Sequence, residues 1–465
     1  MTKSLEEKVI RNEEVKQPKS DLHKKALVIG GGIAGIRAAL DIANAGFPVV
    51  LMEKRPTIGG HMAQLARIFP KMDLATDVLT PLMNEVGHHP NVRLFTLSEV
   101  IGLEGHLGNF RIRLKRNPRL VDPGKCDLCK ERGSAQCVEV CPVTIPSEFD
   151  EGLTLRKAIY IPFPQAIPLT YTIDENVCIS CGKCAQPDVC GPGAVNLAEE
   201  EEIVEEDVGV VIVTTGYELC GQESVAKYGV NECPDVITSL QFERFLSPEG
   251  PTAGIPKRPS DGKVPKKIAF IHCAGSRGQS HMHYMKAIRS AYLAKQAILF
   301  KKLVPDGEAH SLYGDVGAVG ENYEQLKKRA REEAGVNYVQ AEVSRIYEQN
   351  GKVKILGVDS QLHKSIEMEV DMVVLALPMV PSPGIKDLAD QNEIRVDEPE
   401  FPPETHPKLL PVESATSGIF VAGCAQTPMD IQSTMTQARA AAEKALMVLT
   451  QMEHMRGSTK EKLEE

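Results

Sequence analysis

Two stretches of this chain share one order of elements, and that repetition constrains its fold more than any other feature. Residues 25–46 have the pattern of an apolar strand, a glycine turn and an amphipathic helix, and residues 265–302 repeat that order. Each unit is followed, far along the chain, by an apolar strand that ends in a turn, at 207–218 and at 371–382. Alternating strands and helices are typical of parallel sheets, so the pattern predicts an α/β chain with two Rossmann-like domains.

The first unit carries a dinucleotide-binding motif. Gly30, Gly32 and Gly35 have the G-x-G-x-x-G spacing between the predicted strand and helix. Such glycines permit a tight turn, a close approach of the backbone to a pyrophosphate and close packing of the helix on the strand. Glu53 follows the second predicted strand, about 20 residues on, where a carboxylate binds a ribose hydroxyl. We therefore predict a nucleotide site rather than a glycine-rich structural turn.

FAD is favoured over NAD because further segments are similar to those of flavoproteins with two dinucleotide-binding domains. Residues 53–60 resemble the segment after their acidic residue, and 418–423 resemble their second flavin-contacting strand. Most such proteins continue with Gly-Asp, whereas this chain has Gly423-Cys424, which leaves the polar contact at 424 open. The predicted flavin contacts are Gly30, Gly32, Ile33, Ala34, Gly35, Glu53, Lys54, Gly59, Gly60, His61, Met62, Val100, Thr215, Gly216, Gly423, Cys424, Asp430 and Ile431. His61 stays open between a flavin contact and a surface residue.

The second unit lacks a complete glycine motif. Only Gly275 and Gly278 remain in the loop at 271–278, which suits a pyrophosphate less well. We therefore predict a nucleotide-binding-like domain without bound NAD(P)H. No acid–base or nucleophile set is recognisable beside the first glycine loop, so no catalytic residue is predicted.

Eight of the twelve cysteines lie in two groups between residues 126 and 190. The first group reads C-x2-C-x7-C-x3-C-P and the second reads C-x2-C-x2-C-x5-C-G-P. Close thiolates of this kind hold iron–sulfur cubanes, and in two-cluster ferredoxins the fourth cysteine of each motif ligates the other centre. On that rule the two predicted 4Fe–4S ligand sets are Cys126, Cys129, Cys137 and Cys190, and Cys178, Cys181, Cys184 and Cys141.

Zinc is the main alternative for these cysteines, because paired C-x2-C motifs also build tetrahedral zinc sites. The C-x2-C-x2-C run and the Cys-Pro ending favour iron, while the longer loops within both motifs leave the pairing open. Cys220, Cys233 and Cys273 lack ligand-like spacing and are predicted to be small buried side chains. Cys424, beside the predicted flavin strand, is the remaining thiol to test for chemistry.

Composition narrows the class of protein and its location. A net charge of −10 argues against a nucleic-acid partner. No apolar run approaches the roughly 18–20 residues that span a bilayer. The charged N-terminus lacks the apolar core of a signal peptide, so we expect a cytoplasmic chain with reduced cysteines. The acidic run at 198–207 is predicted to be a solvated hairpin or linker.

The predicted division of the chain follows from these patterns. An FAD-binding domain in three parts encloses an insertion and a second domain. The boundaries are 1–23 for a disordered arm, 24–116, 201–265 and 386–452 for the FAD-binding domain, 117–200 for a ferredoxin-like insertion with two clusters, 266–385 for the second domain, and 453–465 for a tail.

Most of residues 24–450 resembles the A subunit of heterodisulfide reductases. The likeness is closer still to the A subunit of the related quinone-interacting membrane-bound oxidoreductase of sulfate reducers. The segments that carry it include GGGIAGIRAALDIANAG, EKRPTIGGHMAQL, IDENVCISCGKC and GIFVAGCAQTPMDIQSTMTQA. The resemblance implies FAD in a thioredoxin-reductase-like fold and electron exchange between that flavin and cubanes. The partners it implies are other redox subunits of a heterodisulfide-reductase-like or quinone-interacting complex, with a homodimer as a second arrangement and membrane contact only through partners.

Two departures from the family pattern point to a reduced set of cofactors. Leu74 and Asp77 stand in a region where many relatives have two cysteines, and 284–290 lacks the cysteines of a second stretch. Because neither leucine nor methionine can replace a thiolate on iron, we expect one flavin, two cubanes and no third cluster. Two alternatives remain open: an autonomous NAD(P)H-dependent oxidoreductase similar to the small subunit of glutamate synthase, and a non-catalytic assembly subunit with structural clusters.

Overall fold

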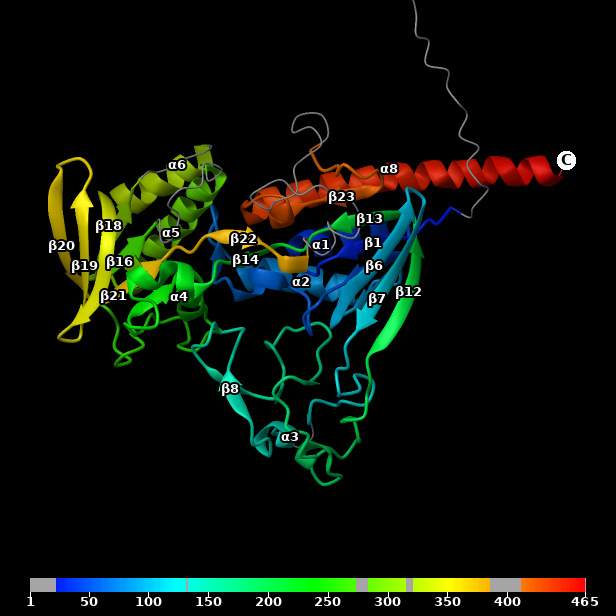
Figure 1. Ribbon diagram of the computed structural model, residues 1–465, viewed down its shortest axis with the longest axis horizontal. Coiled ribbons are helices and arrows are strands. Elements are labelled where there is room, and N and C mark those ends of the chain that lie inside the picture. The colour runs from blue at the N-terminus through cyan, green and yellow to red at the C-terminus, as the bar shows by residue number, and fades with distance from the viewer. Residues whose placement is uncertain (1–21, 131–132, 273–282, 315–320, 385–410, 465) are drawn as a thin grey trace, which may run out of the picture.

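The computed structural model describes residues 22–130, 133–272, 283–314, 321–384 and 411–464 (Figure 1). The first domain is built on a five-stranded parallel sheet in the order β23-β13-β1-β2-β5. Its strands are β1 (Ala26–Ile29), β2 (Val49–Met52), β5 (Val92–Phe95), β13 (Val210–Val213) and β23 (Ile419–Val421).

The two faces of this sheet are covered differently. One face packs against α1 (Ile33–Asn44), α2 (Ala75–His88) and α8 (Ile431–Glu464). The other packs against an antiparallel sheet of β6 (Ser98–His106), β7 (Asn109–Arg116) and β12 (Glu202–Val208). In β1, Ala26 and Val28 join the helix-side core while Leu27 and Ile29 join the other. A strand that is buried on both faces has apolar residues at every position. This is why the continuous apolar sequence at 25–30 predicted a buried strand.

The second domain has a seven-stranded sheet in the order β15-β21-β16-β17-β18-β19-β20. Its strands are β15 (Val236–Thr238), β16 (Lys267–Ile271), β17 (Glu308–Tyr313), β18 (Asn337–Gln349), β19 (Lys352–Asp359), β20 (Lys364–Val370) and β21 (Met372–Leu375). The helical elements are α4 (Ser239–Leu246), α5 (His283–Leu303), α6 (Glu321–Lys328) and the π-helical turn η4 (Arg329–Glu333). One core of this domain lies between α4, α5 and the sheet, and the first five strands of that order pair in parallel.

Short elements connect the domains and shape the space between them. The chain crosses from one domain to the other through β14 (Tyr217–Leu219) and returns through β22 (Met379–Pro381), and these two strands pair antiparallel. The remaining short elements are η1 (Gly60–Gln64), β3 (Arg67–Ile68), β4 (Asp73–Leu74), η3 (Gln222–Tyr228) and η5 (Gly423–Ala425). A cleft between the domains is thereby bordered by η1, β14 and the start of α8.

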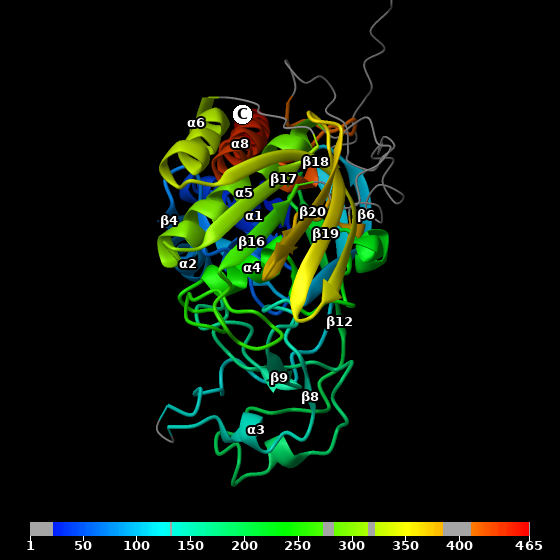
Figure 2. The ribbon, with the colours of Figure 1, turned by 90° about the vertical axis from the view of Figure 1, so that its left-hand side faces the viewer.

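Residues 117–200 run between β7 and β12 and project as a separate lobe beneath both domains (Figures 1 and 2). The lobe has little regular structure: α3 (Gln136–Glu139), β8 (Thr144–Pro146), β9 (Leu155–Lys157), β10 (Ile159–Tyr160), β11 (Thr172–Ile173) and η2 (Lys183–Ala185). Its small core contains cysteine side chains from both motifs together with Leu120, Ile159 and Ile173. So few apolar groups form a weak core by themselves, and bound metal commonly stabilises lobes of this kind.

Two elements differ from the sequence prediction. The acidic run at 198–207 was predicted to be a solvated hairpin or linker. All of it except Glu206 is at least partly exposed, but most of it forms β12, paired with β7 in register from Val208↔Phe110 to Glu202↔Arg116. The tail predicted at 453–465 is mostly helical, because α8 runs to Glu464. None of the helices in the described ranges is long and apolar enough to cross a membrane.

Candidate functional site

A cleft of about 1390 Å³, its open mouth included, lies where the carboxyl ends of β1, β2 and β13 face the second domain. Ligand sites commonly occur at such domain interfaces and at the carboxyl edge of parallel sheets. Most of the residues predicted to bind a flavin line this one cleft. They are Gly30, Gly32, Ile33, Ala34, Glu53, Lys54, Gly60, His61, Met62, Thr215, Gly216, Cys424, Asp430 and Ile431.

The other four predicted contacts lie just outside the cleft lining. Gly35 and Gly423 are close-packed positions behind it, and a Cβ at Gly423 would lie 3.0 Å from the Ala34 side chain. Gly59 has a φ of +120° and its N–H donates to Gly31 O at 2.7 Å, so it shapes the wall through the backbone. Val100 packs against the core between the two sheets of the first domain. Val100 does not line the cleft, so its position does not support the predicted flavin contact.

The glycine turn shows why each position needs glycine. Gly30 has a φ of +109°, and a Cβ on it would lie 2.4 Å from Thr214 O. A Cβ on Gly35 would lie 1.8 Å from Gly30 O, because α1 packs directly on the turn. At Gly32, by contrast, no atom of the described chain lies within 4 Å of the Cβ position. Gly30 and Gly35 are thus required by the fold, while Gly32 leaves space for a ligand.

This contrast gives a prediction that separates folding from flavin binding. Gly35→Ala should destabilise the chain, because overpacking costs about 1–3 kcal/mol and backbone atoms cannot move aside easily. Gly32→Ala should leave the unfolding midpoint of the flavin-free chain unchanged but remove bound flavin, because its methyl group occupies the ligand's space. Urea unfolding and the flavin absorbance of the purified chains measure the two effects. Flavin retained by Gly32→Ala would contradict this role.

Glu53 lies at the end of β2, where the sequence predicted a ribose-binding carboxylate. It is buried; its Oε2 accepts a hydrogen bond from Gly31 N at 2.7 Å and its Oε1 one from Arg55 N at 2.8 Å. Burial raises the pKa of Glu53, and the two backbone N–H groups partly oppose that shift. The carboxylate is thereby fixed beside the glycine turn, in the wall of the cleft.

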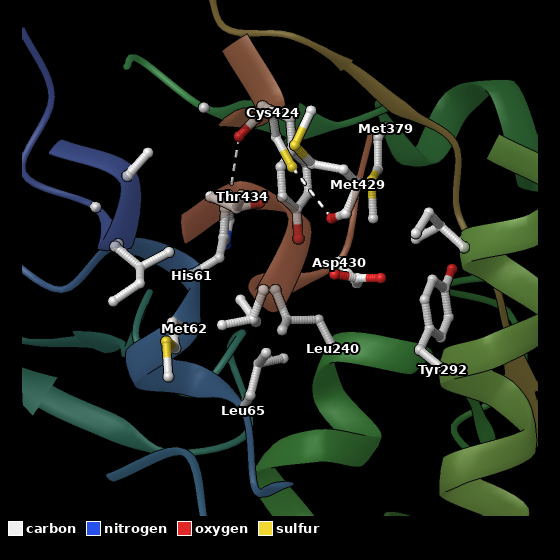
Figure 3. Close-up of a pocket in the computed structure, with 18 of the residues that line it drawn as sticks. His61, Met62, Leu65, Leu240, Tyr292, Met379, Cys424, Met429, Asp430 and Thr434 are labelled. Carbon is white, nitrogen blue, oxygen red and sulfur yellow. Dashed lines mark hydrogen bonds between the residues drawn. The ribbon is translucent and has the colours of Figure 1, made fainter. Parts of the chain in front are cut away.

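The opposite wall comes from η5, α8 and the second domain (Figure 3). Cys424 lies on η5, and its thiol donates to Met429 O at 3.5 Å. Burial raises the pKa of Cys424, so the thiol stays protonated near neutral pH. Figure 3 shows Tyr292 of α5, from the second domain, beside the same cleft. Cys424 thus reaches the cleft as a neutral hydrogen-bonding group in place of the aspartate expected there.

Several lining residues carried no sequence signal. They belong to the second domain or to the connecting strands, where no motif marks them: Tyr217, Glu218, Ser239, Leu240, Glu243, Tyr292, Lys295 and Met379. Only the packing of the second domain on the first brings them to the cleft.

Glu243 and Lys295 form an almost fully buried ion pair in this lining, with 2.7 Å between Lys295 Nζ and Glu243 Oε1. Lys295 Nζ also donates to Arg67 O at 2.8 Å, and Glu243 Oε2 accepts from Ala66 N at 3.0 Å. Gln296 Nε2 donates to Glu243 Oε1 at 2.6 Å. The pair therefore joins the segment between η1 and β3 to helices α4 and α5. Such a pair is tolerated in the interior because its remaining donors and acceptors are satisfied.

The first predicted cysteine set is assembled around a small cavity in the lobe. Cys126, Cys129, Cys137 and Cys190 line about 390 Å³ of largely apolar space, although they come from both motifs. Burial raises the pKa of Cys137 to about 12, and the nearby Cys129, Cys126 and Cys190 add to the shift. The four thiols of the predicted first set thus lie together, and the crossed pairing that the ferredoxin rule gives for cluster binding stays a prediction.

The second set also gathers across the motifs. Burial raises the pKa of Cys184 to about 11, and the neighbouring Cys178, Cys181 and Cys141 contribute. No disulfide joins any of the cysteines in the described ranges. Within those ranges, no three histidine, cysteine, aspartate or glutamate side chains are positioned around one metal ion. Four thiols around an apolar cavity nevertheless have the ligand type and number that a cubane requires.

A third cavity lies between the lobe and the cleft. It holds about 1820 Å³ of open space and is lined by lobe residues such as Phe149 and Tyr160 and by His61 and Gly60 of η1. We call it the intermediate cavity. His61 and Gly60 also line the cleft, and Ile159, the neighbour of Tyr160 in β10, lines the cysteine cavity. A short run of residues therefore leads from the cleft to the first cysteine set.

Some predictions concern residues outside the described ranges. The loop with Gly275 and Gly278 falls there, as do Cys273 and the predicted disordered arm up to residue 21. Cys233 is buried as predicted, whereas Cys220 is only partly buried. His61 is partly buried and lines the cleft, which favours a ligand contact over a surface position.

Comparison with known proteins agrees with this geometry. The FAD dependent oxidoreductase family matches residues 26–89, which include the glycine turn and Glu53. The iron-sulfur A subunit of the CoB–CoM heterodisulfide reductase of Methanocaldococcus jannaschii is 42% identical over 96% of this chain and 67% of its own length. The chain belongs to the family of heterodisulfide reductase A subunits. A second member, the A subunit of the H(2):CoB-CoM heterodisulfide,ferredoxin reductase of Methanothermobacter marburgensis, is 40% identical over 95% of this chain and 66% of its own length.

Solved structures establish the fold class of this family member. Thioredoxin reductase of Lactococcus lactis has a TM-score of 0.50 at 13% identity, covering 92% of this chain and 99% of that one. LpdA of Mycobacterium tuberculosis has a TM-score of 0.51 at 12% identity, covering 91% and 72%. The predicted thioredoxin-reductase-like flavoprotein fold is confirmed. Together with the matches to the FAD dependent oxidoreductase family and to the heterodisulfide reductase A subunits, it supports an FAD-dependent oxidoreductase. The chain spans about two thirds of the length of its relatives, 66% of the one from Methanothermobacter marburgensis.

Proposed function

We propose that this chain is an electron-transfer subunit that holds FAD in the cleft and two 4Fe–4S clusters in the lobe, within a heterodisulfide-reductase-like complex. The observation that carries the proposal is the cavity formed by Cys126, Cys129, Cys137 and Cys190, with Ile159 in its wall. Ile159 is followed directly by Tyr160, which reaches the intermediate cavity and, through it, the residues of η1 at the flavin cleft. The intermediate cavity thus borders both the lobe and the cleft.

The chemistry would come from the cofactors, and the chain would position them. A flavin exchanges two electrons with its donor, whereas a cubane carries one electron at a time. A flavin and a cubane together therefore link two-electron transfer to one-electron transfer. Cys126, Cys129, Cys137 and Cys190 would hold one cluster, and Cys178, Cys181, Cys184 and Cys141 the other. Cluster potential depends on burial and hydrogen bonding at the sulfurs. Each set has one buried thiol, Cys137 or Cys184, but only the second set has an exposed one, Cys181, so the two centres would differ in potential.

The partners proposed for the chain are other redox subunits. Relatives are named as the A subunits of heterodisulfide reductases, and one of those names includes ferredoxin. A quinone-interacting partner, a homodimer and a cytoplasmic location with membrane contact only through partners remain proposals from the sequence resemblance. The described residues favour neither of the two alternative functions.

Cofactor analysis after anaerobic purification tests this function. We expect about one FAD and about eight irons with matching sulfide per chain, from two four-iron centres. About four irons, or zinc in their place, would overturn the two-cluster assignment. Rapid bleaching of the flavin by NADH or NADPH would instead favour an autonomous oxidoreductase. Clusters that resist reduction together with the flavin would favour a structural role.

A further inference from the structure

His61 occupies the boundary between the flavin cleft and the intermediate cavity. It is the second residue of η1 and lines both spaces. Its ring stacks on Tyr217 of β14, with 4.6 Å between the ring centroids and 25° between the ring planes. A group in this position can sense charge in the cleft while water reaches it from the other side.

Both ring nitrogens of His61 face oxygen acceptors. Nδ1 lies 2.9 Å from Gln64 Oε1, and Nε2 lies 3.1 Å from the carbonyl oxygen of Tyr217. The Gln64 amide cannot be reversed without loss, because its Nε2 donates to Phe149 O and to Glu151 Oε1, each at 3.0 Å. A neutral imidazole has one N–H, so it satisfies one of these two contacts, whereas the cation satisfies both.

The groups around His61 act on its pKa in opposite directions, with a net lowering. Burial lowers the pKa of His61, and Arg55 in the loop after β2 lowers it further. Glu218 on β14 acts in the opposite direction, although Lys54 partly neutralises it at 2.9 Å. From the lobe, Glu151 reaches His61 only through Gln64. The two hydrogen-bond acceptors therefore favour the protonated imidazole of His61, whereas burial favours the neutral imidazole. One added charge nearby can then decide the protonation state of His61.

We propose that His61 takes up one proton when the FAD in the cleft is reduced and releases it on reoxidation. The two electrons come from a redox partner and add negative charge to the cleft. The proton comes from water in the intermediate cavity, and it completes the second hydrogen bond of the His61 ring. This inference rests on FAD in the cleft, as proposed above, and it does not depend on the clusters. His61 would then set how strongly the flavin potential depends on pH.

The test is the pH dependence of the flavin midpoint potential, measured by spectroelectrochemical titration of the purified chain between about pH 6 and pH 9. The slope of that dependence gives the number of protons taken up with the two electrons. On reduction of the flavin, His61→Gln should take up about one proton fewer than the wild-type chain, over the part of this pH range where His61 titrates. A purely structural role for His61 would shift the potential without changing the slope.

Two further variants complete the design. Gln64→Met removes the acceptor at Nδ1 but keeps His61, so it should also lower the slope, and it carries the test if His61→Gln loses its flavin. His88→Gln is the matched control, because His88 is exposed at the end of α2 and does not line the cleft. A wild-type slope in His61→Gln, with flavin bound, would overturn the inference, and so would a wild-type slope in Gln64→Met if His61→Gln loses its flavin. Absence of FAD from the wild-type chain would instead overturn the proposed function.

Discussion

Replacing Cys190 by serine is expected to remove the same iron–sulfur centre as replacing Cys126, although the two residues belong to different motifs. Both line the cavity that Cys129 and Cys137 complete. A serine oxygen is a poorer ligand for cluster iron than a thiolate, so each variant should lose about four of about eight irons. Electron paramagnetic resonance of the reduced chains should then show one and the same remaining signal in both variants.

The reciprocal variants make this test decisive. Cys141→Ser should match Cys178→Ser and lose the other centre, because Cys141 and Cys178 both lie near Cys184. Cys233→Ser is the control, since Cys233 is buried in the second domain, away from the lobe. If the spectrum of Cys190→Ser matched that of Cys178→Ser, each motif would hold its own cluster and the crossed pairing would be wrong.

Lys295→Met should be among the most destabilising single changes outside the lobe. It leaves the Glu243 carboxylate buried without its cation, and loss of one partner of a buried pair costs about 3–5 kcal/mol. The bonds that hold the segment between η1 and β3 against α4 and α5 are weakened as well, so flavin affinity should fall. Urea unfolding monitored by circular dichroism, together with the flavin content, measures both effects.

Two comparisons separate the buried charge from loss of a lysine in general. Lys266→Met removes a lysine whose partner, Asp306, is exposed, so it should hardly change the unfolding midpoint. Adding Glu243→Gln to Lys295→Met removes the uncompensated charge and should restore part of the stability. An unfolding midpoint for Lys295→Met no lower than that of Lys266→Met would show that the pair contributes little.

Local spacing predicted those parts of the site that depend on backbone conformation or on ligand type. Gly30 and Gly35 were predictable because a tight turn under a helix excludes any side chain. Glu53 was predictable because it ends the strand beside that turn. The predicted cysteine sets followed from the interleaving of two ferredoxin-like motifs. The structure brings thiols of both motifs together at Cys137 and at Cys184, while their binding of clusters stays a prediction.

The acidic run at 198–207 shows where local pattern misleads. Its charges predicted a solvated hairpin or linker, and most of the run is exposed, but Glu206 is only 5% exposed and contacts both Lys25 and Arg93. Strand pairing with β7 fixes that segment, and cations from distant parts of the chain neutralise the buried carboxylate. The residues next to Glu206 in the sequence do not indicate that Lys25 and Arg93 will lie beside it.

The sequence by itself determined the glycine turn, the acidic residue at the end of β2 and the inventory of candidate thiol ligands, because each depends on residues close together in the chain or on a fixed motif. Only the tertiary structure decided that Lys295, Glu243 and Tyr217 line the flavin cleft, and that His61 stands between that cleft and the intermediate cavity. The physical reason is that these positions are set by the packing of the two domains and the lobe against one another. Such packing depends on shape and burial summed over many distant residues, which no short pattern encodes.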